Sequence, residues 1–192
     1  MKVLILMGSP RKRGNSAQLI EPFVDELKSN GHEVEIIWTY DLTISPCVAC
    51  CKCQGDWENY ACWQKDDGTM IAEKFLENDL VVLSTPIYGW YCTAPMKALL
   101  DRMVYGMCKF YGKEMGPVLW EGTKLALIST CGYPMDKGSD LWIEGMKRYC
   151  KHCRLEFTDA ITERQKNLKH KFMDDEKEQR IREFARKLNS IT

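Results

Sequence analysis

Residues 2–16 read KVLILMGSPRKRGNS, and this stretch decides the fold. After its first lysine, Lys2–Met7 is a continuous apolar run, which is typical of a strand buried on both faces. Gly8–Gly14 breaks the run, and Asn15 or Ser16 can then cap the helix that follows. A buried strand, a loop and a helix in this order predict the first unit of an α/β fold.

The alternation of strands and helices continues along the chain. Apolar runs predict further strands at 33–38, 79–84, 124–129 and 154–161, and helical spacing predicts helices at about 15–30, 68–77, 95–105 and 139–151 and around 181–188. Five strands separated by helices favour right-handed crossovers, and therefore a parallel sheet with helices on both faces. Ligands of such sheets bind beyond the carboxyl ends of the strands. The loops after the first, third and fourth strands are therefore the candidate site.

Length and charge narrow the classes of function. At 192 residues we expect one domain, residues 1–192, with an irregular cysteine-rich loop, residues 44–67, between the second strand and the second helix. Lys+Arg and Asp+Glu are 27 each, and this balance indicates neither a nucleic acid nor a membrane partner. No apolar run reaches the roughly 20 residues that cross a bilayer, and the start lacks the features of a signal peptide. We expect a cytoplasmic protein.

The first loop offers groups that bind phosphate. Ser9 and Ser16 supply hydroxyls, Asn15 supplies an amide, and a helix N-terminus supplies backbone N–H groups and a partial positive charge. Arg11, with the two basic residues that follow it, adds positive charge. A solvated turn followed by a helix cap explains the loop equally well.

The second loop offers apolar faces for a flat aromatic ligand. Pro86, Tyr88, Gly89 and Trp90 lie in the string TPIYGWYCTAPMKALLDR, residues 85–102. Ordinary aromatic residues at the rim of the sheet are the alternative. The third loop, STCGYP at residues 129–134, does not by itself indicate a ligand.

The two motifs together, GSPRKRGNS and TPIYGWYCTAPMKALLDR, resemble the phosphate loop and the flavin-ring segment of the NADPH-dependent FMN reductase branch of the flavodoxin-like superfamily. The resemblance implies a three-layer flavodoxin-like fold with a five-stranded parallel sheet in the order 2-1-3-4-5. It also implies bound FMN. The FMN ligands carried over to this chain are Ser9, Arg11, Gly14, Asn15, Ser16, Pro86, Ile87, Tyr88, Gly89, Trp90, Thr130, Cys131 and Gly132.

Five of the ten cysteines lie between Cys47 and Cys62. Cys47, Cys50 and Cys53 form C-x2-C-x2-C, a spacing that wraps one face of a 4Fe–4S cluster, and Cys62 can supply the fourth thiolate. The segment resembles the compact cysteine motif of iron–sulfur flavoproteins, a branch of the same family, although the gap before Cys62 is longer and Cys51 offers another ligand. The pair Asp66-Asp67 resembles the acidic pair that follows that motif.

Two other interpretations of these cysteines stay open. Four thiolates also suit structural zinc, and reduced thiols in a loop that covers the flavin need no metal. We expect the remaining cysteines to be small buried side chains; they are Cys92, Cys108, Cys131, Cys150 and Cys153.

The resemblance also implies an activity. We expect an FMN-dependent oxidoreductase that takes electrons from NAD(P)H or reduced ferredoxin and passes them to a quinone, a free flavin or oxygen, with a 4Fe–4S cluster as a possible relay. A non-enzymatic electron carrier that uses FMN and the cluster is the alternative. No side chain is singled out as a catalytic acid or base. The family suggests a homodimer or a homotetramer.

Overall fold

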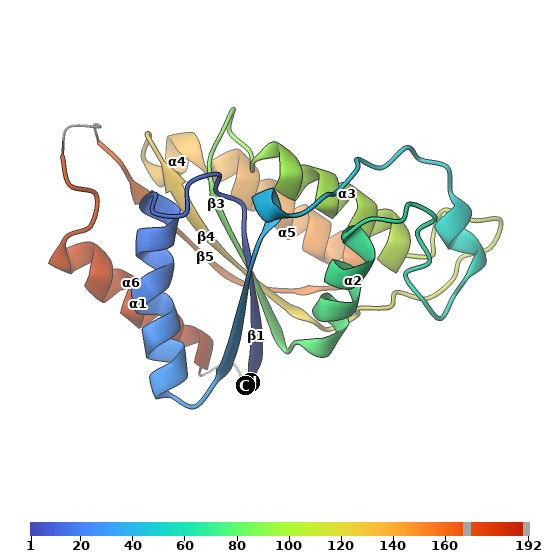
Figure 1. Ribbon diagram of the computed structural model, residues 1–192, viewed down its shortest axis with the longest axis horizontal. Coiled ribbons are helices and arrows are strands. Elements are labelled where there is room, and N and C mark those ends of the chain that lie inside the picture. The colour runs from blue at the N-terminus through green and yellow to red at the C-terminus, as the bar shows by residue number, and fades with distance from the viewer. Residues whose placement is uncertain (167–169, 190–192) are drawn as a thin grey trace.

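The computed structural model of the chain describes residues 1–166 and 170–189, and its centre is a five-stranded parallel sheet (Figure 1). The strands are β1 (Lys2–Met7), β2 (Glu33–Trp38), β3 (Leu80–Pro86), β4 (Lys124–Cys131) and β5 (Glu156–Arg164). Their order is β2-β1-β3-β4-β5, and every neighbouring pair is parallel. The predicted fold class and strand order are confirmed.

Helices cover both faces of the sheet, as predicted (Figure 1). They are α1 (Asn15–Ser29), α2 (Gly68–Glu77), α3 (Ala94–Met107), the short α4 (Met135–Gly138), α5 (Asp140–Cys153) and α6 (Asp175–Asn189), with 3-10 turns η1 (Thr39–Asp41) and η2 (Lys52–Gly55). Helices α1 and α6 lie on one face, and α2, α3 and α5 lie on the other. None of the helices within residues 1–166 and 170–189 is long and apolar enough to cross a membrane.

Alternation along β1 divides the core between the two faces. Val3 and Ile5 pack with Phe23 on the α1 side, whereas Leu4 and Leu6 pack with the helices of the other side. All four β1 side chains are fully buried. Side chains of a strand point alternately to opposite faces, so a continuous apolar run serves two cores at once.

The ends of several elements differ from the prediction. β3 and β4 run two residues further, to Pro86 and Cys131, and β5 runs three residues further, to Arg164. The extensions follow from pairing, because Pro86 lies opposite Thr130, and Cys131 lies opposite Arg164. These partners come from distant parts of the chain, which local sequence patterns do not report.

The predicted cap of α1 is wrong. Neither Asn15 nor Ser16 is the capping residue; both lie inside the helix, and Gly14 takes the cap position without a side-chain hydrogen bond. The Ser16 hydroxyl is buried and lies 3.2 Å from the Thr130 hydroxyl oxygen. The Ser16 hydroxyl therefore contacts Thr130, which is distant in the sequence, instead of capping the helix.

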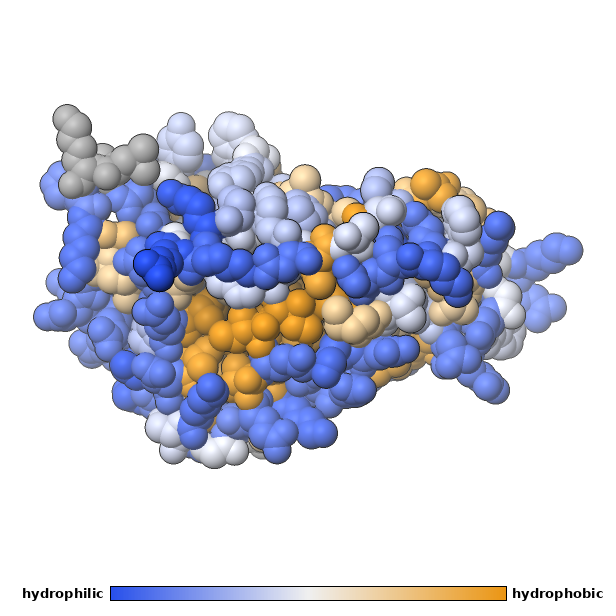
Figure 2. Space-filling model, viewed as in Figure 1, coloured by the Kyte–Doolittle hydropathy of each residue, from blue (hydrophilic) through white to orange (hydrophobic). Residues whose placement is uncertain are grey.

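β2 is an edge strand and leaves apolar side chains partly exposed. Ile36 is 40% exposed, and a shallow groove between α1 and β2 is lined by Ile20, Val24, Ile36 and Trp38, among others. Figure 2 shows apolar surface gathered on this face of the molecule. The carboxyl end of the sheet carries the loops described next.

Candidate functional site

The loops that follow β1, β3 and β4 are joined by hydrogen bonds at the carboxyl edge of the sheet. The Gly8 N–H donates to the Ser84 carbonyl oxygen at 2.7 Å, and the Thr93 hydroxyl donates to the Gly8 carbonyl oxygen at 2.7 Å. The Ile87 N–H donates to the Thr130 carbonyl oxygen at 2.8 Å. The structure thus brings the three predicted loops together.

The N-terminus of α1 opens into the first loop with its backbone donors uncapped. Gly14 has no side chain to satisfy the N–H groups of the first turn, which are orphan donors of every helix. A Cβ atom on Gly14 would lie 3.0 Å from the Arg11 Cβ atom, so the loop closes tightly there. Ser9 is buried, and its hydroxyl oxygen accepts the Arg11 N–H at 3.2 Å. A helix end of this kind attracts an anion.

The three cations of this loop have different surroundings. Lys12 forms an ion pair with Asp41, and its ammonium group lies 4.2 Å from the centre of the Trp38 ring. Arg11 and Arg13 are exposed on the loop. The two arginines therefore supply the positive charge for an anion at the start of α1, while Lys12 turns toward β2.

Asn15 and Ser16 already have partners in the protein. The Asn15 side-chain amide donates to the Gln165 side-chain oxygen at 3.1 Å, and the Ser16 hydroxyl contacts that of Thr130. These contacts tie the start of α1 to the ends of β4 and β5. An anion at this position would meet the backbone N–H groups of both residues first.

The loop after β3 is a tight hairpin that presents two aromatic rings. Tyr88 and Tyr91 exchange both backbone hydrogen bonds, at 2.9 and 3.1 Å, across Gly89 and Trp90. Gly89 and Trp90 have φ angles of +56° and +63°, which the two central residues of a type I′ turn require. Tyr88 is 52% exposed and Trp90 is 51% exposed. Tyr91 instead packs edge-on against the buried Trp142.

The loop after β4 offers its backbone rather than its side chains. Thr130 and Cys131 are buried, and the Cys131 sulfur accepts the Tyr133 N–H at 3.4 Å. Gly132 is exposed, and no atom lies within 4 Å of the position of a Cβ atom on it. This loop therefore leaves open backbone beside the aromatic hairpin. Together, the uncapped helix end, the arginines and the exposed rings fit a ligand with a phosphate and a flat aromatic ring.

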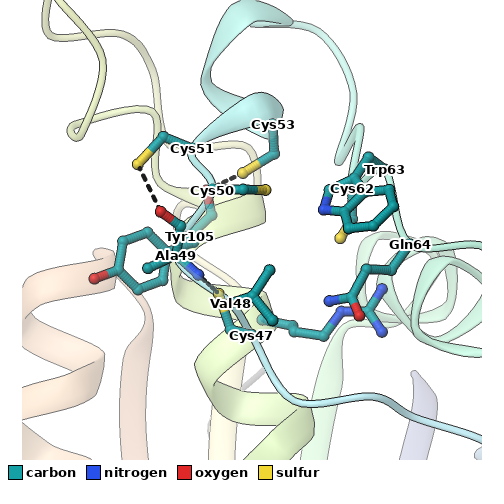
Figure 3. A pocket seen from close by; sticks show the side chains of 11 residues that line it. Cys47, Val48, Ala49, Cys50, Cys51, Cys53, Cys62, Trp63, Gln64 and Tyr105 are labelled. Atoms are coloured by element: carbon teal, nitrogen blue, oxygen red, sulfur yellow. Dashed lines mark hydrogen bonds between the residues drawn. The ribbon is translucent and has the colours of Figure 1, made fainter.

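The cysteine-rich loop surrounds a second hollow. Cys47, Cys50, Cys53 and Cys62 all line it, and its empty volume is about 350 Å3, part of it open to solvent (Figure 3). The Cys53 thiol lies 3.3 Å from the Tyr105 carbonyl oxygen, and burial raises its pKa. Cys51 lines the hollow as well, but its thiol points to the Ala49 carbonyl oxygen at 3.6 Å.

Two aspartates close this loop at its base. The Thr43 N–H donates to the Asp67 carboxylate at 2.7 Å, and the Ser45 N–H donates to the Asp66 carboxylate at 2.9 Å. The Asp67 N–H returns a bond to the Thr43 carbonyl oxygen at 3.1 Å. The two ends of the loop are therefore fixed side by side.

Lys109 holds the far side of the loop and is fully buried. Its ammonium group donates to the carbonyl oxygens of Cys53, at 2.9 Å, and Asn59, at 2.7 Å. Burial lowers the pKa of Lys109 because the charged form loses its water. Sequence reasoning missed this residue, since a lysine in a polar segment ordinarily indicates a solvated side chain.

Arg102 of α3 also lines the hollow, and its side chain is 0% exposed. Its Nη1 atom donates to both Asp66 carboxylate oxygens, at 2.5 and 2.6 Å. Burial raises the pKa of Asp66, but bonds from Arg102 and from backbone N–H groups lower it more, so it lies below its usual value. Sequence reasoning also missed this pair as part of the site. The available signal was an arginine inside the apolar stripe of α3.

Within residues 1–166 and 170–189, no group of three or more histidine, cysteine, aspartate or glutamate side chains is arranged so that it could hold a metal ion. The structure therefore does not bring the predicted cluster ligands Cys47, Cys50, Cys53 and Cys62 together as a metal site. The prediction that the other cysteines are buried is confirmed; they are Cys92, Cys108, Cys131, Cys150 and Cys153.

Curated relatives are similar in sequence to part of the chain. The chain is 43% identical over 128 residues to an iron-sulfur flavoprotein of Archaeoglobus fulgidus, covering 65% of this chain and 61% of that protein. It is 33% identical over 134 residues to an FMN-dependent NADH:quinone oxidoreductase of Exiguobacterium sp., covering 61% of each chain. The chain spans about half to three-fifths of the length of the first curated relatives that it matches.

Solved structures show the same fold over the whole chain. An NAD(P)H:quinone oxidoreductase from Methanothermobacter marburgensis superposes with a TM-score of 0.70 at 20% identity, covering 98% of this chain and 97% of that one. An azoreductase from Bacillus anthracis superposes with a TM-score of 0.70 at 18% identity, covering 100% of both chains. The family model described as NADPH-dependent FMN reductase matches residues 1–136. The chain therefore belongs to the NADPH-dependent FMN reductase family.

Proposed function

We propose that this chain is an FMN-dependent oxidoreductase that takes electrons from NAD(P)H and reduces a small acceptor of the quinone type. One observation carries the proposal: the uncapped N-terminus of α1 and the exposed aromatic hairpin lie at the same edge of the sheet. Family membership supports FMN as the ligand. The names of the quinone oxidoreductases among the relatives support the donor and the acceptor.

Different residues bind the two parts of FMN, its phosphate and its ring. The backbone N–H groups of the first turn of α1, with Arg11 and Arg13, hold the phosphate, while Ser9 keeps the loop in shape. Tyr88 and Trp90 would hold the ring, and the exposed backbone at Gly132 would supply polar groups to it. When bound, FMN supplies the redox chemistry, because it accepts a hydride and releases electrons singly or in pairs.

We further infer that the cysteine loop holds a 4Fe–4S cluster through Cys47, Cys50, Cys53 and Cys62. Each thiolate of such a cluster binds a different iron, so the four sulfurs stand around a hollow rather than around one ion. The four cysteines line one hollow, and the C-x2-C-x2-C spacing of the first three suits a cluster loop better than the paired knuckles of structural zinc. The name of the Archaeoglobus relative supports the same assignment.

The cluster gives the flavin a second electron route. Reduced ferredoxin is therefore an alternative donor, and a free flavin or oxygen an alternative acceptor. We infer a homodimer or homotetramer as the working form, on the basis of the family resemblance.

The first experiment asks which groups the protein binds. The chain is purified without oxygen, and its visible spectrum, iron and acid-labile sulfide are measured on one sample. We expect flavin bands over a broad absorbance, with about four irons and four sulfides per chain. Flavin bands without iron would exclude the cluster and leave the proposed reductase. No flavin after addition of FMN would overturn the proposed reductase.

The second experiment tests the phosphate site and the turnover. Gly14→Ala inserts a methyl group 3.0 Å from the Arg11 Cβ atom, and we expect the Kd for FMN to rise about tenfold, a loss of about 1.4 kcal/mol. Ser29→Ala, at the other end of α1, is the matched control and should bind FMN normally. The loaded wild type should oxidise NAD(P)H steadily in the presence of a quinone; reduction by a protein donor alone would favour the electron carrier.

A further inference from the structure

A buried arginine beside the cysteine hollow has two donor atoms without a hydrogen-bond partner among the described residues. Arg102 lines the hollow with its side chain fully buried, and its Nη1 atom serves Asp66. Within residues 1–166 and 170–189, its Nε and Nη2 atoms have no hydrogen-bond partner. Buried polar atoms are almost always paired in native proteins, and a charged donor loses most when it is not. These atoms therefore indicate a ligand.

The surrounding residues fix the guanidinium in this position. A Cβ atom on Gly68 would lie 2.8 Å from the Arg102 Cζ atom, so the guanidinium packs directly on the backbone at the start of α2. Asp66 is held from its other side by the backbone N–H groups of Ser45, at 2.9 Å, and Gly68, at 3.1 Å. The carboxylate thus orients the arginine. Its Nη2 atom lies against the Gly68 backbone, and the Tyr60 hydroxyl, also buried without a hydrogen-bond partner among the described residues, lies close enough to interact with its charge.

A cluster in the hollow would add negative charge beside Arg102. A cluster with four thiolate ligands is an anion, and its negative charge grows when it accepts an electron. Net charge and hydrogen bonds to the sulfurs are two of the factors that set the reduction potential of such a cluster. Arg102 supplies both a positive charge and two N–H donors, and the Cys62 thiol lies close enough to interact with its charge.

We propose that Arg102 donates hydrogen bonds to the iron–sulfur cluster from inside the hollow and raises its reduction potential. The inference rests on the proposed function, because it requires the cluster. Asp66 is the positioning residue, since it acts by orienting the guanidinium. Lys109 is a second buried cation at this loop: it donates to backbone carbonyl groups, and its charge also interacts with the Cys53 thiol.

Redox titration of the loaded protein, followed by electron paramagnetic resonance, tests this role. Arg102→Lys keeps a positive charge and loses the planar set of donors. The double variant D66N/R102Q removes both charges, so that neither partner is left buried alone. Arg148→Gln is the control, because Arg148 forms an exposed pair with Glu144 on α5. FMN content reports that each variant is folded.

At the midpoint potential of the wild type, we expect the ratio of reduced to oxidised cluster to fall at least tenfold in D66N/R102Q. For a one-electron couple this equals a shift of 59 mV to more negative potential. Arg102→Lys should lie between the double variant and the wild type, and Arg148→Gln should match the wild type. Equal midpoints in all loaded proteins would overturn this inference alone. A wild type that takes up no iron would overturn the cluster and the inference together.

Discussion

Tyr60 lies on the backbone of α3 at Gly106, so closely that no side chain fits between them. A Cβ atom on Gly106 would come within 2.2 Å of the Tyr60 ring. The ring is buried in the core on that face of the sheet. A single glycine thus allows the cysteine-rich loop to pack against the helix.

Gly106→Ala should therefore destabilise the protein. Alanine gains about 1 kcal/mol of helix propensity, but the displaced ring costs about 1–3 kcal/mol, so we expect a net loss of up to about 2 kcal/mol. The free energy of unfolding in urea measures this change. Gly55→Ala is the control, because no atom lies within 4 Å of its added methyl group. Equal stability of the two variants would contradict the packing described.

Asp66 makes a pH-dependent contribution to stability. Its pKa lies below the usual value of 3.8 in the folded protein. The stabilisation is therefore fully present above about pH 4 and is lost as the pH falls through the folded pKa. Asp66→Asn leaves Arg102 buried without its counter-charge, and we expect a loss of about 3 kcal/mol at pH 7.

The same variant should lose less at pH 3, because this pH lies below the unfolded pKa of 3.8 and part of the stabilisation by the carboxylate is already lost. Urea unfolding at the two pH values provides the comparison. Glu144→Gln removes an exposed pair and should lose less than about 1 kcal/mol at either pH. A loss for Asp66→Asn that did not change with pH would mean that the carboxylate charge is unimportant.

At this scale the sequence predicted residue types better than residue partners. The loop residues of the flavin site could be named because two motifs carried them. The partner of Ser16 could not, since Thr130 lies 114 residues away and a serine at that position ordinarily indicates a helix cap. Arg102 was missed for a similar reason, because its partner Asp66 and its place in the hollow depend on how the loop folds back.

Among the elements, the loop of residues 44–67 depends on α3 and the segment that follows it. The Gln54 side-chain amide donates to the carbonyl oxygens of Tyr105, at 2.5 Å, and Cys108, at 3.2 Å. Lys109 adds two bonds from the same segment. The loop has little regular structure of its own, so these few polar contacts decide its order.

Lys109→Met should loosen this loop while leaving the sheet intact. The substitution keeps the apolar stem and removes both bonds to the loop carbonyls. If local opening becomes easier by about 1.4 kcal/mol, cleavage by a protease within residues 44–67 rises about tenfold. Lys113→Met, on the exposed part of the same segment, should be cleaved at the wild-type rate. Identical rates for the two variants would show that Lys109 does not hold the loop.

The existence and order of the elements could be predicted because long apolar runs and helical stripes are local signals. β1, β2 and α2 have the predicted bounds. The strand ends near Pro86 and Arg164 depend on pairing with β4. The four-residue α4 is too short to show the hydrophobic repeat of a helix. Tertiary contacts decide these features.

At the scale of the whole molecule, binding of FMN should stabilise the fold, because its site joins β1, β3 and β4. At a concentration 100 times its Kd, FMN adds about 2.7 kcal/mol. For a chain of this size we expect Tm to rise by about 5–10 °C. Riboflavin has the same ring but no phosphate, and it should raise Tm much less at the same concentration. Equal shifts in thermal unfolding would argue against a phosphate site at the start of α1.

Helix α3 reaches from one proposed centre to the other. Its first turn follows Thr93, which bonds to the loop after β1, and Arg102 lies about two turns further on, at the cysteine hollow. Eight residues of helix rise by about 12 Å, so α3 fixes the separation between the two proposed centres. Electron transfer slows steeply with distance, and a relative with one turn less in this helix would bring the two centres about 5 Å closer. If both groups are bound as proposed, the length of one helix would thus set how fast they exchange electrons.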